Sequence, residues 1–168
     1  MRIELNPMSM RSHATPLGGV DAFIHYVSTQ AHVAPGGWAG AAWFILRIGE
    51  DVANIRLHDL WQPARFLRQM AAAPPLGFGV DGFITSLVDD RNPARHYLAF
   101  VFVGFWLPAR LAKGVLYAWE VAGFIRYRGV WSPHDVACGK IGLRHGALVR
   151  SYGPVVLPAL IAAELAHK

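Results

Sequence analysis

The most apolar part of the chain follows a polar turn and reads Asn92-Pro-Ala-Arg-His-Tyr-Leu-Ala-Phe-Val-Phe-Val-Gly-Phe-Trp-Leu-Pro108. Asn92 is a preferred N-cap residue, and Pro93 suits the first helical turn because its missing N–H has no partner there in any case. After His96 the segment has no polar face, which is typical of a helix buried in the centre of a fold. Pro108 cannot continue a helix. We therefore predict a central, buried helix over about 93–107.

Further helices are expected on the C-terminal side of this one. A helix over about 108–126 combines apolar residues with Arg110, Lys113 and Glu120. Ser132-Pro133 is typical of another helix start, and this helix is expected to run to about residue 152. A short apolar helix over about 155–166 ends the chain. Residues 92–166 are thus expected to form the motif-bearing helices of a single domain.

The N-terminal part is expected to be an irregular arm or lead-in over 1–35. Within it, residues 21–31 fit either a short helix capped by Asp21 or a strand, because Phe, Ile, Tyr, Val and Thr also favour strands. These two alternatives stay open at the level of sequence.

A helical lobe is expected over 36–73. It contains a buried helix from Trp38 to Ile48, ended by Gly49, and a second helix over about 52–73 that Pro63 kinks or divides. The run 74–79 is rich in proline and glycine and is typical of a turn or linker. Alternating strands joined by hairpin turns do not occur in the sequence, so the fold class is all-α, a compact helical bundle.

The composition indicates either a large core or a surface that something else covers. Hydrophobic residues make up 54% of the 168 residues and charged residues 16%, against about 25% charged in an ordinary soluble domain. Such a balance is expected of a protein that buries apolar surface against a protein partner or a membrane surface. The segment 38–48 is too short to span a bilayer, and charges over 108–126 make a span there costly. The N-terminus lacks the apolar core of a signal peptide.

The net charge of +5 fits an anionic partner, but the basic residues are scattered along the chain. A nucleic-acid surface normally has clustered Lys and Arg, so nucleic acid is not favoured as the partner. The single cysteine, Cys138, excludes an intramolecular disulfide and a cysteine-based zinc cluster. The sequence does not indicate an oligomeric state, a metal or a cofactor.

Four residues form the densest group of catalytic types within apolar surroundings. His96 lies in the first turn of its predicted helix, where a helix N-terminus favours a neutral imidazole that can act as a base. Arg95 beside it can hold a carboxylate or phosphate. Glu120, if buried, is suited to general acid–base work or to ligation. Asp135 can orient His96 or add an oxygen ligand.

Each of these residues also has a purely structural interpretation. Ser132 and Asp135 have the spacing of a capping box, which would explain Asp135 without chemistry. Glu120 can form a salt bridge with Arg95, and His96 can be a structural residue. Separately, Gly139, Gly142 and Gly146 recur every three or four residues, and we expect them to mark a close approach between two helices.

The order of these motifs resembles the small helical C-terminal domain of certain polymorphic bacterial toxins. That family has an Arg-His pair at the start of an apolar helix, then His-Glu, then Asp-x-x-Asn-Asn-x-x-Gly. Over about 92–146 the chain matches with Arg95-His96, with Glu120, and with Asp135 and Gly142. Trp119 stands in place of the family's histidine, and Cys138-Gly139 stand in place of both asparagines.

The resemblance implies a helical fold and a toxin-like effector domain, with hydrolase chemistry acting at or near a membrane or cell envelope. In that hypothesis His96 is the base, Glu120 the acid or a ligand, Asp135 the orienting group and Arg95 the anion clamp. The substituted positions favour an alternative from another class. The chain would then be a non-enzymatic structural or interaction subunit of a larger or membrane-associated assembly.

Overall fold

The computed structural model describes residues 18–59, 62, 65–66, 68–69, 72–88, 92–126 and 132–167. Over this part of the chain the regular backbone is helical, and one isolated antiparallel bridge joins Phe83 to Ala166. The elements are α1 (Gly19–Val33), α2 (Gly37–Ala53), η1 (Leu57–Asp59), η2 (Thr85–Leu87), α4 (Pro93–Trp106), α5 (Ala109–Arg126), α6 (Pro133–Tyr152), η3 (Pro154–Val156) and α7 (Leu157–Glu164). The predicted all-α bundle is confirmed.

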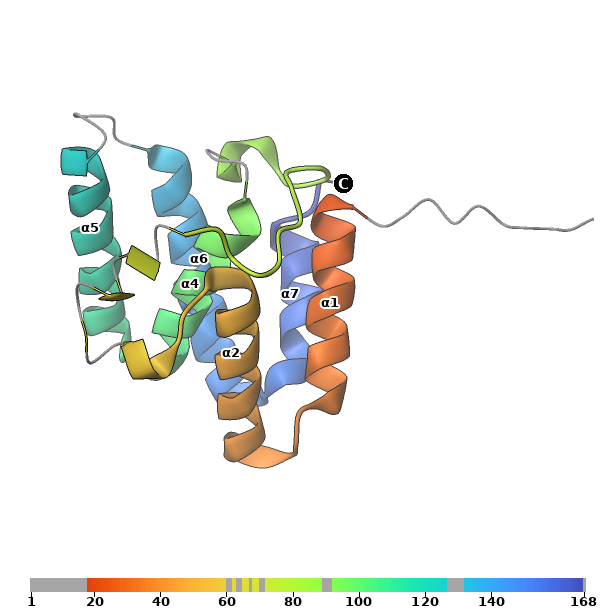
Figure 1. The fold of residues 1–168 in the computed structure, drawn as a ribbon. Coiled ribbons are helices and arrows are strands. Elements are labelled where there is room, and N and C mark those ends of the chain that lie inside the picture. Colours follow the sequence, from red (N-terminus) through yellow and green to blue (C-terminus); the bar gives the residue numbers. More distant parts are fainter. Residues whose placement is uncertain are drawn as a thin grey trace, which may run out of the picture.

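Helix α4 is the centre of the bundle, as its sequence predicts. Tyr97 and Val101 are fully buried in it, and the main hydrophobic core joins α4 to α1, α2, α6 and α7. In Figure 1, α5 lies at one edge of the bundle, and α1 lies beside α7 at the other. A smaller apolar cluster of Phe100, Leu116 and Leu143, with Ala112, attaches α5 to α4 and α6.

Local signals placed the ends of the central helices correctly. Asn92 and Ser132 stand at the N-cap positions of α4 and α6, each followed by proline, and α4 ends just before Pro108. Ser132 caps through its side chain, whose Oγ accepts a hydrogen bond from the Asp135 N–H at 3.0 Å. Asn92 makes no such side-chain cap bond.

Glycines allow α4 and α6 to pack backbone against backbone. A Cβ built on Gly146 of α6 would lie 2.1 Å from the Val101 carbonyl oxygen, and one on Gly142 would lie 2.6 Å from that of Tyr97. On the α4 side, a Cβ on Gly104 would lie 2.1 Å from the Leu143 oxygen. The predicted close approach of two helices at these glycines is therefore confirmed.

In the N-terminal part the structure corrects the expected lead-in. Residues 19–33 form α1, so the irregular arm predicted for 1–35 is wrong there, while residues 1–17 lie outside the described residues. The helical alternative for 21–31 is the right one, because Phe23 and Val27 both pack into the core from one helix face. Asp21 lies in the first turn, and Gly18 occupies the N-cap position.

The end of α2 was also predicted wrongly. The helix continues through Gly49 to Ala53. Gly49 lies inside it because the Phe102 ring packs where a side chain would be, 2.9 Å from the Cβ position. Asn54 then adopts the left-handed conformation, with φ of 59°, and ends the helix. Asparagine tolerates that region better than most residues.

The helix predicted over about 52–73, kinked or divided at Pro63, is wrong in its first part, because α2 continues to Ala53. Asn54 interrupts it, and a 3₁₀ turn at 57–59 follows. Residues 65, 66, 68 and 69 are helical, residues 72–79 are not, and Pro63 lies outside the described residues. At the other end of the chain, the helix predicted over 155–166 is divided into η3 and the shorter α7. None of the described helices has the length and apolar character needed to cross a bilayer.

Candidate active site

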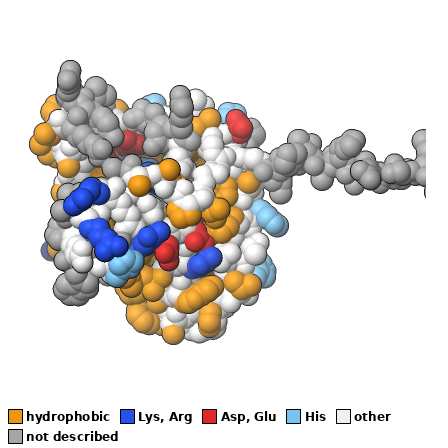
Figure 2. All heavy atoms as spheres, in the orientation of Figure 1, with side chains coloured by type: hydrophobic (Ala, Val, Ile, Leu, Met, Phe, Trp, Pro, Cys, Tyr) orange, Lys and Arg blue, Asp and Glu red, His pale blue; other side chains and the backbone are white. Residues whose placement is uncertain are grey.

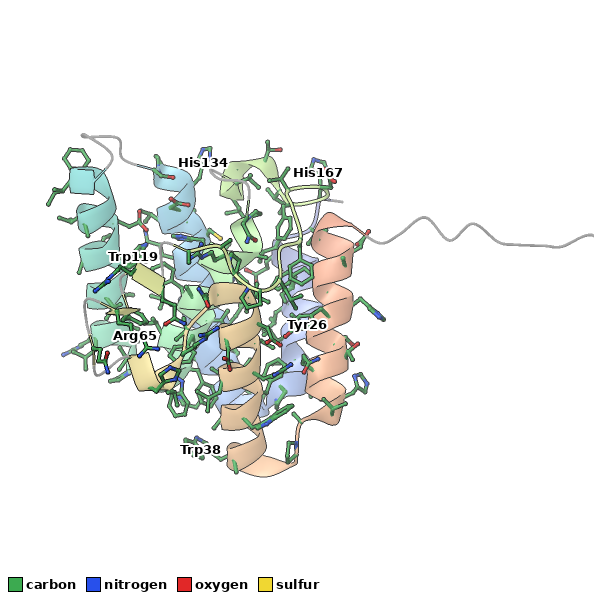
Figure 3. The ribbon with its side chains drawn as sticks, viewed as in Figure 1. Tyr26, Trp38, Arg65, Trp119, His134 and His167 are labelled. Carbon is green, nitrogen blue, oxygen red and sulfur yellow. The ribbon has the colours of Figure 1, made fainter. Side chains whose placement is uncertain are left out.

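Three helices bring His96, Glu120 and Asp135 together. His96 comes from the first turn of α4, Glu120 from α5 and Asp135 from the first turn of α6. The His96 ring lies with Nε2 3.9 Å from Glu120 Oε1 and with Nδ1 3.9 Å from Asp135 Oδ1. Figure 3 labels Trp119 on α5 and His134 on α6, the sequence neighbours of the two acids. Two carboxylates, from Glu120 and Asp135, thus lie on either side of the His96 imidazole.

Hydrogen bonding assigns the proton on this imidazole. His96 Nε2 lies 2.9 Å from the backbone oxygen of Asp135. A carbonyl oxygen only accepts, so Nε2–H is the donor, and the lone pair of the neutral ring is on Nδ1. Nδ1 therefore faces the Asp135 carboxylate, also an acceptor. The Nδ1 lone pair and the Asp135 carboxylate are both acceptors, so they face each other favourably only when Nδ1 carries a proton or when a hydrogen-bond donor lies between them.

Local structure holds each of the three side chains in place. The Ser132 cap orders the α6 backbone from which Asp135 offers both its carbonyl and its carboxylate to His96. Glu120 continues the buried stripe of α5, one turn after Leu116. The His96 ring packs on Phe100, one turn along α4, at a centroid distance of 5.0 Å. Capping therefore accounts for the backbone N–H of Asp135 and leaves its carboxylate directed at His96.

The three side chains differ in how much of their surface is exposed to solvent. Glu120 is 7% exposed, His96 13% and Asp135 29%. A charged carboxylate with so little exposure needs compensating partners, and the adjacent imidazole can supply a proton or a positive charge. Asp135 is the member of the group most open to solvent. Arg95 is partly buried in the same first turn of α4, and its role as an anion clamp stays a prediction.

Metal coordination is not built into this arrangement. Protein nitrogen and carboxylate oxygen ligands lie about 2.0–2.2 Å from zinc, so ligands on one ion usually approach each other closely around it. In the described part of the chain no group of three or more His, Cys, Asp or Glu side chains has a geometry that could hold a metal ion. The arrangement can act as a proton donor and acceptor as it stands.

A second polar group, which the sequence did not indicate, lies inside the core. Tyr97 Oη is 2.8 Å from His145 Nδ1, and His145 Nε2 is 3.3 Å from Glu164 Oε1. Glu164 is also paired with Arg144. Nδ1 shares a hydrogen bond with the tyrosine hydroxyl, while Nε2 lies within ion-pair distance of the Glu164 carboxylate without forming a hydrogen bond to it.

Burial favours the uncharged forms of His145 and Tyr97. His145 is fully buried, and desolvation lowers its pKa below the usual 6.5, although Glu164 acts in the opposite direction. Desolvation likewise raises the pKa of Tyr97 far above its ordinary range. The one sequence signal for this group was the place of His145 between two close-packing glycines, Gly142 and Gly146, which predicts burial but names no partner.

Arginines scattered in the sequence also line one hollow. Its volume is about 530 Å³, and its described lining residues are Arg56, Gln62, Arg65, Arg68 and Gln69. Figure 2 shows Lys and Arg side chains gathered on this part of the visible face, and Figure 3 labels Arg65 among them. Arg56 is paired with Glu50 at 3.4 Å. His96 is not among the described residues that line this hollow.

Comparison of the chain with protein-family models, with curated proteins and with solved structures gives no match.

Proposed function

We propose that this chain is a toxin-like effector domain whose His96 site carries out hydrolysis at or near a membrane or cell envelope. The observation that carries the proposal is the meeting of His96, Glu120 and Asp135. Each carboxylate oxygen lies 3.9 Å from a ring nitrogen, although 39 residues separate His96 from Asp135. The same three residues stand at positions that match the motifs of the toxin domain in sequence order.

His96 is the base of the proposed reaction. Its Nδ1 takes a proton from water, and the resulting hydroxide attacks an electrophilic carbonyl or phosphoryl centre. The Asp135 carboxylate stabilises the imidazolium that forms, since it lies within ion-pair distance of Nδ1. The leaving group takes a proton from Glu120 in its acid form or from the imidazolium. The Asp135 carbonyl, bonded to Nε2–H, orients the ring.

The substituted family positions support a different function. Gly139 packs against α5, and a Cβ on it would lie 2.6 Å from Leu116 Cδ1. An asparagine side chain there would require the Leu116 and Phe100 side chains to shift, so apolar packing occupies the position of the family's polar group. Cys138 is buried in the main core. The second candidate is therefore a non-enzymatic interaction subunit, which the large exposed apolar residues Trp38, Leu111 and Ile125 also favour.

Expression in bacterial cells, directed to the cytoplasm and in parallel to the periplasm, separates the two candidates. We expect the wild type to slow growth and His96→Ala and Glu120→Ala to relieve that effect. His25→Ala is the matched control, because His25 is an exposed histidine on α1 far from the site in sequence. All four proteins are purified, and their thermal midpoints are compared to show that each is folded.

If the folded His96→Ala protein still inhibits growth, the hydrolase hypothesis is wrong. The interaction subunit is then supported if a defined protein co-purifies in fixed stoichiometry with the wild type and with His96→Ala alike. Relief of inhibition by His96→Ala, but not by His25→Ala, supports chemistry at the site.

A further inference from the structure

Helix α5 buries only one narrow stripe. Ala112, Leu116 and Glu120 recur every four residues and face α4 and α6. Ala112 and Leu116 belong to the apolar cluster with Phe100 and Leu143, and Glu120 lies near His96. Figure 1 shows α5 as the outermost helix on its side of the bundle. Most of the surface of this helix therefore faces outward.

The outward surface of α5 is apolar and aromatic. Leu111 is 61% exposed and Ile125 73%. The other large exposed apolar side chains of the helix are Val115, Tyr117, Trp119, Val121 and Phe124. Exposed side chains of this size on one helix are unusual on a monomer, where apolar residues scatter singly. Trp119 lies two turns after Ala112, beside the buried stripe, and Phe124 has a further contact, so we call Leu111, Val115, Tyr117, Val121 and Ile125 the outer face of α5.

The charges on the same helix have one sign. Among the described side chains of α5, the exposed charged residues are Arg110 and Lys113, and the acid Glu120 is turned inward to His96. Apolar and aromatic residues combined with cations, and with no acid on the outside, are typical of helices that lie in the interface of an anionic bilayer. Charge complementarity thus points to a negatively charged occupant.

A second copy of the chain fits this face less well. A two-fold dimer brings the same patch of both copies together, so cations in the patch need acids in the same patch. The described outer face offers none, and the net charge of +5 adds repulsion between copies. Lipid phosphates supply the missing negative charge, and acyl chains accept the apolar side chains.

We propose that α5 docks by its outer face onto the surface of an anionic lipid bilayer. The helix has 18 residues, so at about 1.5 Å per residue it is roughly 27 Å long and lies along the membrane plane. Glu120 then sits on the side away from lipid, which places the His96 site about one helix diameter, roughly 10 Å, from the membrane surface. The docking deepens the membrane part of the proposed function, but it does not require chemistry at His96.

Vesicle sedimentation of the full chain tests the proposal. Vesicles contain phosphatidylcholine alone or phosphatidylcholine with an equal amount of phosphatidylglycerol. We expect binding to the anionic vesicles and much weaker binding to the neutral ones. Leu111→Glu combined with Ile125→Glu should weaken anionic binding at least about tenfold, because apolar burial is lost and negative charge is added. Arg110→Gln combined with Lys113→Gln should weaken it about 30-fold, from the loss of two cations.

The controls separate docking from folding and from catalysis. Val33→Glu changes a residue of α1 that is as exposed as Leu111, at 61%, and should bind like the wild type. His96→Ala should also bind like the wild type, so failure of the hydrolase leaves docking intact and failure of docking leaves the growth assay to decide chemistry. Unchanged binding by the Leu111→Glu/Ile125→Glu protein overturns the proposal. Equal binding to neutral and anionic vesicles also overturns it. So does a dimer that the wild type forms and that the Leu111→Glu/Ile125→Glu protein does not form.

Discussion

Substitution of Gly146 by alanine tests the packing on which both the fold and the site depend. The new methyl group would lie 2.1 Å from the Val101 oxygen and 2.6 Å from the Phe105 nitrogen, and real Cβ contacts essentially never fall below 3.0 Å. Both neighbours are backbone atoms of α4, so they cannot rotate away as a side chain can. Helices α4 and α6 must therefore separate along the seam where they share the core.

The expected magnitude follows from two opposing effects. Overpacking typically costs about 1–3 kcal/mol or more, while alanine in place of glycine in a helix returns about 1 kcal/mol. Because the clash is with backbone, we expect a net loss of about 2 kcal/mol, which lowers the thermal midpoint by roughly 4–8 °C in a chain of this size. The shift is measured by circular dichroism during heating and by urea unfolding.

Gly114→Ala is the matched control for this prediction. Gly114 lies inside α5, and an added Cβ meets nothing within 4 Å. The same substitution there should stabilise the protein by about 0.5–1 kcal/mol, through helix propensity and the loss of unfolded-state entropy. A Gly146→Ala protein as stable as the wild type, or a Gly114→Ala protein destabilised as much as Gly146→Ala, would refute the assignment of a close backbone seam to α4 and α6.

Two further predictions concern buried or capping groups. Burial lowers the pKa of His145 below 6.5 in the folded state, so at acidic pH the unfolded chain binds a proton that the folded one resists; stability is complete above pH 6.5 and falls as the pH drops through and below that value. A fall in thermal midpoint over this window should flatten in His145→Gln, and an equal slope in that variant would count against the reasoning. Ser132→Ala removes the cap bond to the Asp135 N–H and should cost about 1 kcal/mol in urea unfolding. Ser151→Ala, on the exposed end of α6, should change little, and equal effects of the two substitutions would contradict the capping role.

Helix α5 contributes Glu120 to the proposed site from one side and carries the proposed docking face on the other. Glu120 points inward to His96, while Leu111 and Ile125 point outward. Among the described residues, α5 contacts the bundle through a small apolar cluster and through the approach of Glu120 to His96. Any change that shifts α5 on α4 therefore alters the distance between Glu120 and the imidazole, and the growth assay and the vesicle assay examine the same helix from its two faces.

The helices around the site were readable from sequence because their signals are local. Asn92-Pro93, Pro108 and Ser132-Pro133 act within one helical turn, through φ restriction and through missing or capped N–H groups. The wrong boundary at Gly49 has the opposite origin. Glycine there costs helix stability locally, but the Phe102 ring from α4 occupies the space that its hydrogen leaves. A contact from a distant helix decided that position.

The chemistry of the site divides in the same way. Residue types and their order selected His96, Glu120 and Asp135 and placed each near a helix start or on a buried stripe. Only the packing of α4, α5 and α6 decided that they meet, that the Asp135 carbonyl holds Nε2–H, and that Nδ1 faces a carboxylate.

The Tyr97–His145–Glu164 group shows the limit of sequence most clearly. Its members are 48 and 19 residues apart along the chain and form no spacing motif. Sequence alone determined where α4 and α6 start and where α4 ends, because the free energies of capping and of proline act between neighbouring residues. Tertiary structure decided which polar atoms share a buried space, because that depends on how closely the glycines of α4 and α6 allow two backbones to approach.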